Sequence, residues 1–289
     1  MRKIRRNLRK KDEAVAGIVV AVMIVGLVLA VISIIQTVYI PKWMESREAE
    51  HLDVVSNQFS QFKYSIDTQI ALKQDVPVSS SIALGSRELG FFISNKAFGR
   101  LALIMDGWSY RIERVPGDTS GGEFGILRYN SENAYFLNQA YIYEIGGVVL
   151  NQTEGAVFII KPEFSVIYET PPATIVNLSF TCIDLIPNGE KTSISGYGTY
   201  PVRTQYIAET NQTIDQVESL TVVTPYPGIW YNFLNSTLTD ANLAFNTHYT
   251  LTKTTNEVTI TFNYFYLANV NLDFKTVLIS AQITPGWSD

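Results

Sequence analysis

The residue types that most often carry catalysis or bind metals are scarce in this chain of 289 residues. Cys182 is the only cysteine, and the two histidines, His51 and His248, lie in segments with different patterns, one helical and one extended. A zinc site takes three or four protein ligands, so we expect no metal site. The glycine pairs 121–122 and 146–147 lack the lysine and following helix of a phosphate-binding loop, so we expect no cofactor. No G-x-S-x-G sequence precedes a helical pattern, and no catalytic residue is assigned.

The single thiol is expected to be structural. Cys182 lies in an extended run and alternates in phase with Val176, Leu178 and Phe180. Alternate residues of a strand point to the same face, so the thiol shares an apolar face with these side chains. We therefore predict a buried, unreactive cysteine.

Four Asn-x-Ser/Thr tripeptides are candidate acceptor sites for N-linked glycans. The four asparagines are Asn151, Asn177, Asn211 and Asn235. We expect Asn151 and Asn211 in turn-like contexts and Asn177 in the middle of a strand. Because all four follow the apolar segment described next, the hypothesis is a glycosylated external region.

The N-terminal part of the chain has the pattern of a membrane anchor. Ala14–Ile40 holds 27 residues with only three polar side chains, and a helix of that length reaches about 40 Å, more than the hydrocarbon core of a bilayer. It is too long for the apolar core of a cleaved secretory signal. Tyr39 and Trp43 at its end are expected to anchor it at the outer membrane interface.

Charge indicates the orientation of this anchor. Residues 1–13 form a basic leader with seven of the 22 Lys and Arg residues, and basic flanks stay cytoplasmic. The part beyond the anchor carries a net charge of −10. We expect the N-terminus inside the cell, the remainder outside, and no nucleic-acid partner.

Residues 41–76 predict an amphipathic stalk helix. Its apolar stripe has spacings of three and four residues and consists of Leu52, Val55, Phe59, Phe62 and Ile66. Residues 14–71 are then one long helix, interrupted or bent at Pro41. Two alternatives remain open for the stripe: it packs on the β domain of its own chain, or it packs against other copies or a partner.

Residues 77–289 predict a β-rich extracellular head. Short alternating runs bounded by Gly, Pro, Asn and Ser indicate strands, and their number favours antiparallel, sandwich-like packing. The fold class expected is a transmembrane-plus-stalk helix followed by an all-β head. One domain or two subdomains divided near 171–188 both fit. The aromatic segment 224–235 is either an exposed contact patch or buried under the rim of the head.

The order of these segments resembles archaeal type IV pilin-like proteins. The residues that carry the resemblance are Lys11-Asp-Glu-Ala-Val-Ala-Gly-Ile, which resembles a class III, prepilin-type signal, and the stretches 40–67 and 127–162, which are similar to uncharacterised euryarchaeal single-pass surface proteins. The resemblance implies leader cleavage after Lys11 or Ala14 and self-association through the N-terminal helix. The family's Glu at the fifth mature position is absent, because Ala16 or Val19 would stand there.

Together these observations predict a membrane-anchored cell-surface structural protein of pilin-like type that forms filaments or mediates adhesion. Its expected partners are membrane lipid, copies of itself, and a cell-envelope protein or glycan. The alternative is a stand-alone anchored binding protein that links to another envelope component. An anchored hydrolase is a third alternative, because paired carboxylates meet only in the folded chain.

Overall fold

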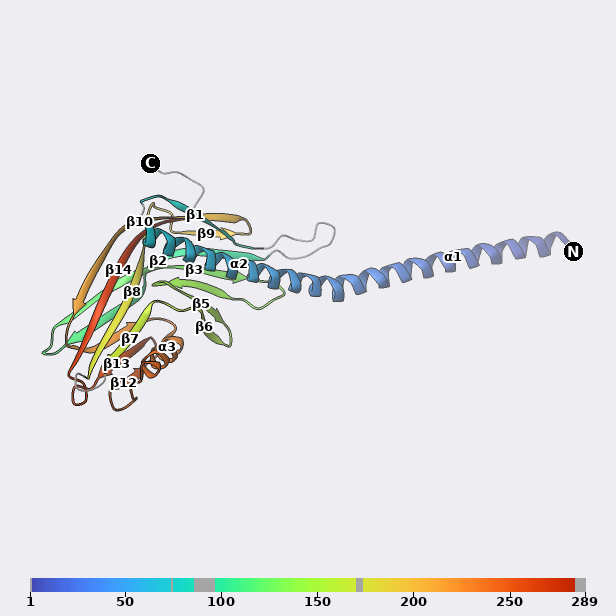
Figure 1. Cartoon of the computed structure of the whole chain (residues 1–289). Coiled ribbons are helices and arrows are strands. Elements are labelled where there is room, and N and C mark those ends of the chain that lie inside the picture. Colours follow the sequence, from blue (N-terminus) through green and yellow to red (C-terminus); the bar gives the residue numbers. More distant parts are fainter. Residues whose placement is uncertain (1, 74, 86–96, 170–173, 284–289) are drawn as a thin grey trace.

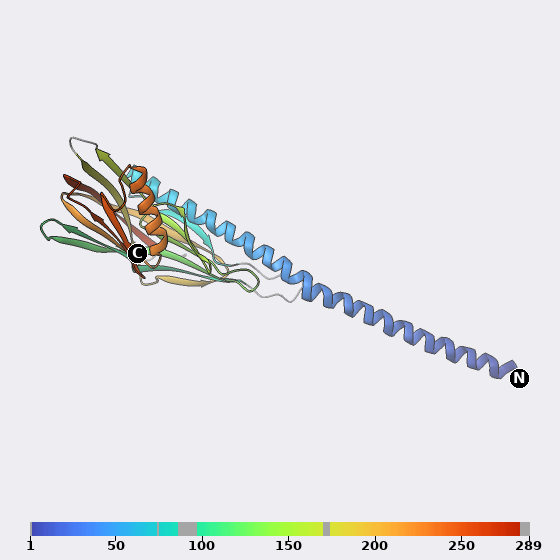
Figure 2. The same cartoon turned by 90° about the horizontal axis from the view of Figure 1, so that it is seen from below.

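The chain folds into one long N-terminal helix and a β-rich head (Figures 1 and 2). The computed structural model describes residues 2–73, 75–85, 97–169 and 174–283, and their side chains from residue 16 onward. Helix α1 (Arg2–Ile34) and helix α2 (Ile40–Leu72) join through a π-helical turn, η1 (Ile35–Tyr39). The first half of the long helix projects away from the head, whereas the second half lies along it.

The π-helical turn explains how the helix passes Pro41. Proline has no backbone N–H and its ring crowds the carbonyl four residues earlier, here that of Thr37. The N–H of Ile40 instead reaches the carbonyl of Ile35, five residues back. Such a π bulge takes up one extra residue without ending the helix. At the interruption predicted near Pro41, the helix therefore widens over one π-helical turn and then continues.

Two sheets form the head, and the chain crosses between them. In spatial order the first sheet contains β1 (Val78–Ala83), β10 (Thr199–Ile214), β14 (Asn269–Ile283), β8 (Ile175–Pro187) and β7 (Phe164–Glu169). The second contains β12 (Tyr249–Lys253), β13 (Glu257–Phe262), β11 (Val217–Val223), β2 (Phe98–Arg114), β3 (Thr119–Glu132), β4 (Ala140–Glu144), β5 (Gly147–Gln152) and β6 (Gly155–Ile160), with β9 (Ser193–Gly196) also paired to β2.

One strand pair corrects the expectation of a wholly antiparallel head. Strands β8 and β14 run parallel over thirteen residue pairs. Between them the chain passes through strands of both sheets, and β14 then enters from the same end as β8. Parallel neighbours require a long connection of this kind.

The possible boundary between two subdomains near 171–188 does not separate the two sheets. Pro171-Pro172 lies outside the described residues, and Pro187 ends β8, which pairs with both β7 and β14. Each sheet takes strands from both sides of that boundary.

A helix replaces the irregular segment expected at 224–235. Helix α3 spans Pro227–Asp240, with a proline at its first position, where the missing N–H is not needed. It packs between the sheets, where Trp230 meets Trp108 at 5.7 Å and Phe158 edge-on at 5.4 Å between ring centroids. Trp230 is fully buried, so this part of the aromatic segment belongs to the core.

The head has two apolar cores. One lies between the sheets and α3 and includes Cys182, which is buried as its phase in the strand predicted. The other surrounds α2, which lies against β1 and residues of β2, β3, β4, β8 and β14. The second core holds half of the long helix in place.

Candidate functional site

The projecting half of the long helix exposes an apolar surface. Every side chain from Ala16 to Ile34 is exposed, and an 18-residue window has a mean hydropathy of 3.3 with no buried residue. Among the described residues this is the one helix long and apolar enough to cross a membrane. Exposed apolar area costs roughly 25 cal/mol per Å² in water. A continuous surface of this size marks an interaction with lipid or with other apolar helices.

The residues predicted to mark the ends of the anchor fall near the ends of this surface. Lys11 and Ala14 lie in α1, although their side chains are outside the described set. At the other end, Tyr39 and Trp43 are each about half exposed, with ring centroids 6.2 Å apart. The pair therefore lies where the apolar surface meets the head.

The apolar stripe of α2 is buried in the head. Its residues are each at most 2% exposed: Leu52, Val55, Phe59, Phe62 and Ile66. Phe59 packs on Tyr141 at 5.8 Å between ring centroids, and Phe62 meets Tyr143 edge-on at 5.2 Å. Of the two alternatives for the stripe, packing on the chain's own head is the one observed. The stripe offers no surface for self-association, because the concave side of the head already covers it.

A buried carboxylate fixes the start of this contact. Glu48 is fully buried, and its oxygens accept hydrogen bonds from the backbone N–H groups of Ala134, Tyr135 and Phe136 at 3.1, 2.8 and 2.7 Å. Charge-assisted bonds of this kind are stronger than neutral ones. Glu48 stands four residues before Leu52, so this carboxylate lies on the same face of the helix as the apolar stripe.

His51, three residues after Glu48, also makes a polar contact with the head. Its Nε2 atom is 3.3 Å from the hydroxyl of Tyr129, which donates to the carbonyl of Leu84 at 2.9 Å. Burial lowers the pKa of His51, against smaller opposing effects of Leu84 and Glu48. The neutral imidazole is therefore favoured in the folded chain.

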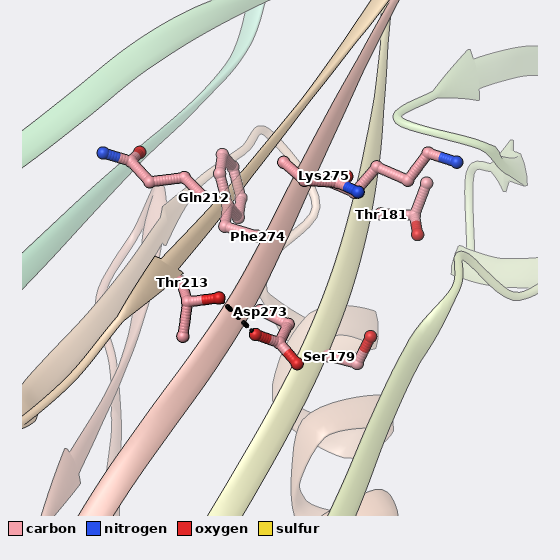
Figure 3. A pocket seen from close by; sticks show the side chains of 8 residues that line it. Ser179, Thr181, Gln212, Thr213, Asp273, Phe274 and Lys275 are labelled. Atoms are coloured by element: carbon pink, nitrogen blue, oxygen red, sulfur yellow. Dashed lines mark hydrogen bonds between the residues drawn. The ribbon is translucent and has the colours of Figure 1, made fainter.

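A second candidate site is a polar depression on the outer face of the first sheet (Figure 3). Its volume is about 340 Å³. Strand register arranges its side chains in two rows across β10, β14 and β8: Thr213, Asp273 and Ser179, then Asn211, Lys275 and Thr181. The Thr213 hydroxyl donates to Asp273 at 2.8 Å. Hydroxyl, amide and charged groups on a shallow face can hydrogen-bond a polar ligand.

An ion-pair network borders this depression. The Lys275 ammonium lies 2.9 Å from Glu209, and Lys73, just after α2, pairs with the same carboxylate. The two lysines lower the pKa of Glu209, with Lys73 contributing most. The network ties the end of the long helix to β10 and β14.

Two of the four candidate glycan acceptors lie on this same face. The four lie in β5, β8, β10 and α3: Asn151, Asn177, Asn211 and Asn235. Asn177 donates to Glu169 at 3.0 Å and accepts from Asn271 at 2.8 Å, so a glycan there would displace bonded groups. Asn211 is exposed and lies within β10, three residues before the strand ends, so the turn-like context expected for it is wrong.

An apolar groove separates α3 from β6. Its volume is about 400 Å³, and its lining includes Phe158, Ile229 and Phe233. The Lys161 ammonium lies 5.8 Å from the ring centroid of Phe233. Strand β6 is an edge strand of its sheet and leaves Val157 exposed.

Below this groove lies a buried ionisable group that the sequence did not indicate. Glu144 is fully buried and accepts a hydrogen bond from the indole N–H of Trp230 at 2.8 Å, whereas its second oxygen has no hydrogen-bond partner among the described residues. Burial raises the pKa of Glu144 to about 7, although the Trp230 bond opposes the shift. At neutral pH this carboxyl is therefore near its titration midpoint.

The histidines and the thiol do not come together. His248 lies in the turn before β12, where its Nδ1 accepts from the N–H of Ala244 at 2.9 Å, while His51 belongs to α2. Burial raises the pKa of the Cys182 thiol well above its usual range, which makes it unreactive. Within the described ranges, no three His, Cys, Asp or Glu residues form a cluster suited to a metal ion.

Comparison with known proteins identifies no relative of this chain. No family model, no curated protein and no solved structure matches the chain. Two surfaces of the molecule therefore bear on its function, the apolar helix and the polar depression.

Proposed function

We propose that this chain is a membrane-anchored cell-surface structural protein of pilin-like type, with the N-terminus in the cytoplasm and the head outside. One observation carries the proposal: the exposed apolar helix of residues 16–34 continues, without ending, into a helix that the head holds tightly. A bilayer covers the first part, and the head covers the second. The basic leader before it supports the orientation.

The same apolar surface also serves self-association in this proposal. The stripe of α2 is occupied by the head, so contacts between copies of the chain involve residues 16–34, the outward face of α2 or the surface of the head. A helix that leaves the bilayer needs other apolar helices around it, as in the core of a filament. On assembly, the apolar surface of residues 16–34 would lose its contacts with lipid and gain contacts with the same helix of other copies.

Electron microscopy of native cells with and without the protein tests the structural role. Loss of surface filaments on deletion, restored by the full chain, is the expected result. Unchanged filaments would point to the stand-alone anchored protein. N-terminal sequencing of native protein adds a second readout, because a start near Asp12 or Val15 indicates pilin-type processing, and retained residues 1–11 make filament incorporation hard to defend.

A second candidate function is binding through the polar depression. The mixed rows of hydroxyl, amide and charged side chains favour a glycan or a polar surface of an envelope protein. To test this, the wild-type protein and the variants Asp273→Ala and Asp118→Ala are immobilised, and the binding of native envelope fractions to each is measured. Asp118 is the control position, because it is an exposed carboxylate in the loop between β2 and β3. Loss of binding in the first variant alone supports this role.

A further inference from the structure

The long helix has no free stalk between its apolar part and the head. Tyr39 is 51% exposed, but Ile40 directly after it is 1% exposed and Met44 is fully buried. The protein therefore covers the helix from the residue at which the apolar segment ends. If a bilayer surrounds residues 16–39, no exposed helical segment separates the head from that bilayer, and the head therefore lies close to its surface.

The length of the apolar helix makes tilting favourable. Residues 16–40 extend about 37 Å at 1.5 Å per residue, whereas a hydrocarbon core is about 30 Å thick. A helix that is too long commonly tilts, and a tilt of about 35° removes this mismatch. Tilting brings one side of the head down toward the lipid headgroups.

One loop of the head presents an apolar tip at this end. Leu137 is 58% exposed, and it directly follows the three residues whose N–H groups bind Glu48. Asn133 braces the loop, since its side-chain amide donates to the carbonyl of Leu137 at 2.9 Å and its backbone N–H donates to Asn138 at 2.7 Å. The tip is thus rigidly attached to the helix, two turns after Ile40.

The exposed side chains of the helix beside this loop suit the membrane interface. Trp43 is 47% exposed, and the exposed residues near it include two basic ones, Lys42 and Arg47, and two acidic ones, Glu45 and Glu50. Tryptophan prefers the headgroup layer, and long basic side chains extend toward lipid phosphates. Apolar tip, indole and basic groups are therefore gathered at the end of the head nearest the apolar segment.

We propose that the head docks on the surface of the bilayer, with the helix tilted so that Leu137 and Trp43 enter the lipid headgroup layer. This inference rests on the proposed anchor. In this arrangement the head has one fixed orientation on the membrane. Its polar depression and the β12–β13 hairpin face away from the lipid.

The test uses the full chain in vesicles of phosphatidylcholine and phosphatidylglycerol that contain a headgroup spin-labelled lipid. An environment-sensitive fluorophore is attached at Leu137→Cys, and in separate variants at Trp43→Cys, Phe265→Cys and Leu27→Cys. The native Cys182 is buried and should not react in the folded protein. Phe265 is the matched control, because it is 85% exposed and lies near the far end of β2, roughly 50 Å from the strand's start.

The expected result is at least threefold stronger spin-label quenching at positions 137 and 43 than at 265. Quenching at 137 as weak as at 265, with the position 27 probe in lipid and position 43 quenched as the anchor alone requires, would overturn the docking and leave the anchor intact. A probe at 27 that is not in lipid would instead overturn the anchor itself. A probe at 137 that is shielded from water but not quenched would show a protein partner at this surface, which also overturns the proposal.

Discussion

The titration of Glu144 gives a quantitative prediction for stability. Its pKa rises from 4.5 to about 7 on folding, because the carboxyl is buried with one hydrogen bond, from Trp230. Between these values the folded chain keeps a proton that the unfolded chain has lost. The stabilisation is complete below pH 4.5 and is lost as the pH rises to about 7. From pH 5 to pH 8 this one group should lower the free energy of unfolding by about 2–3 kcal/mol.

Comparison with Glu144→Gln isolates this effect. The amide keeps an acceptor for the Trp230 indole and removes the titration, so the side chain at position 144 adds no pH dependence to the stability of the variant. We would measure denaturant unfolding of the full chain in a mild detergent from pH 5 to pH 8, with Glu154→Gln on an exposed turn as the control. The stability of wild type relative to Glu144→Gln should fall by about 2–3 kcal/mol across this range. Parallel curves for the two proteins would refute a buried carboxyl that takes up a proton on folding.

Three further outcomes follow from the contacts of the head. Glu48→Ala should cost about 2–4 kcal/mol, because three N–H groups lose their acceptor, and hydrogen exchange at residues 134–136 should accelerate. Phe62→Ala should cost about 3–5 kcal/mol in denaturant unfolding, whereas exposed Tyr64→Ala should stay within about 0.5 kcal/mol. Native protein should exceed in intact mass the bare chain that begins at the same N-terminal residue, and Asn211→Gln should remove one glycan increment.

Some features were predictable because they depend on local sequence. The apolar helix follows from the absence of charge over a length that spans a bilayer, and the buried face of α2 follows from spacings of three and four residues. The face of Cys182 follows from alternation within one strand. The hairpin between β12 and β13 also depends on a short polar turn, across which the N–H of Thr254 reaches the carbonyl of Glu257.

Other features depend on partners far away in the sequence. The burial of Glu48 has no local signal, because its three donors lie more than 80 residues later. Helix α3 was missed because it begins with Pro227 and Gly228 and contains many residues of low helix propensity; packing of Trp230 stabilises it instead. The polar depression exists only when β10, β14 and β8 are placed in register, and no local pattern reports the parallel pairing of the last two.

Labelling of intact cells tests the central claim most directly. Cells that express the Phe265→Cys variant are treated with a thiol reagent that cannot cross membranes, and cells with the natural sequence serve as background because Cys182 is buried. The account predicts strong labelling of the variant in intact cells and retention of the labelled protein in the membrane fraction after alkaline extraction. Labelling only after lysis, or release of the protein into the soluble fraction, would contradict a membrane anchor with an external head.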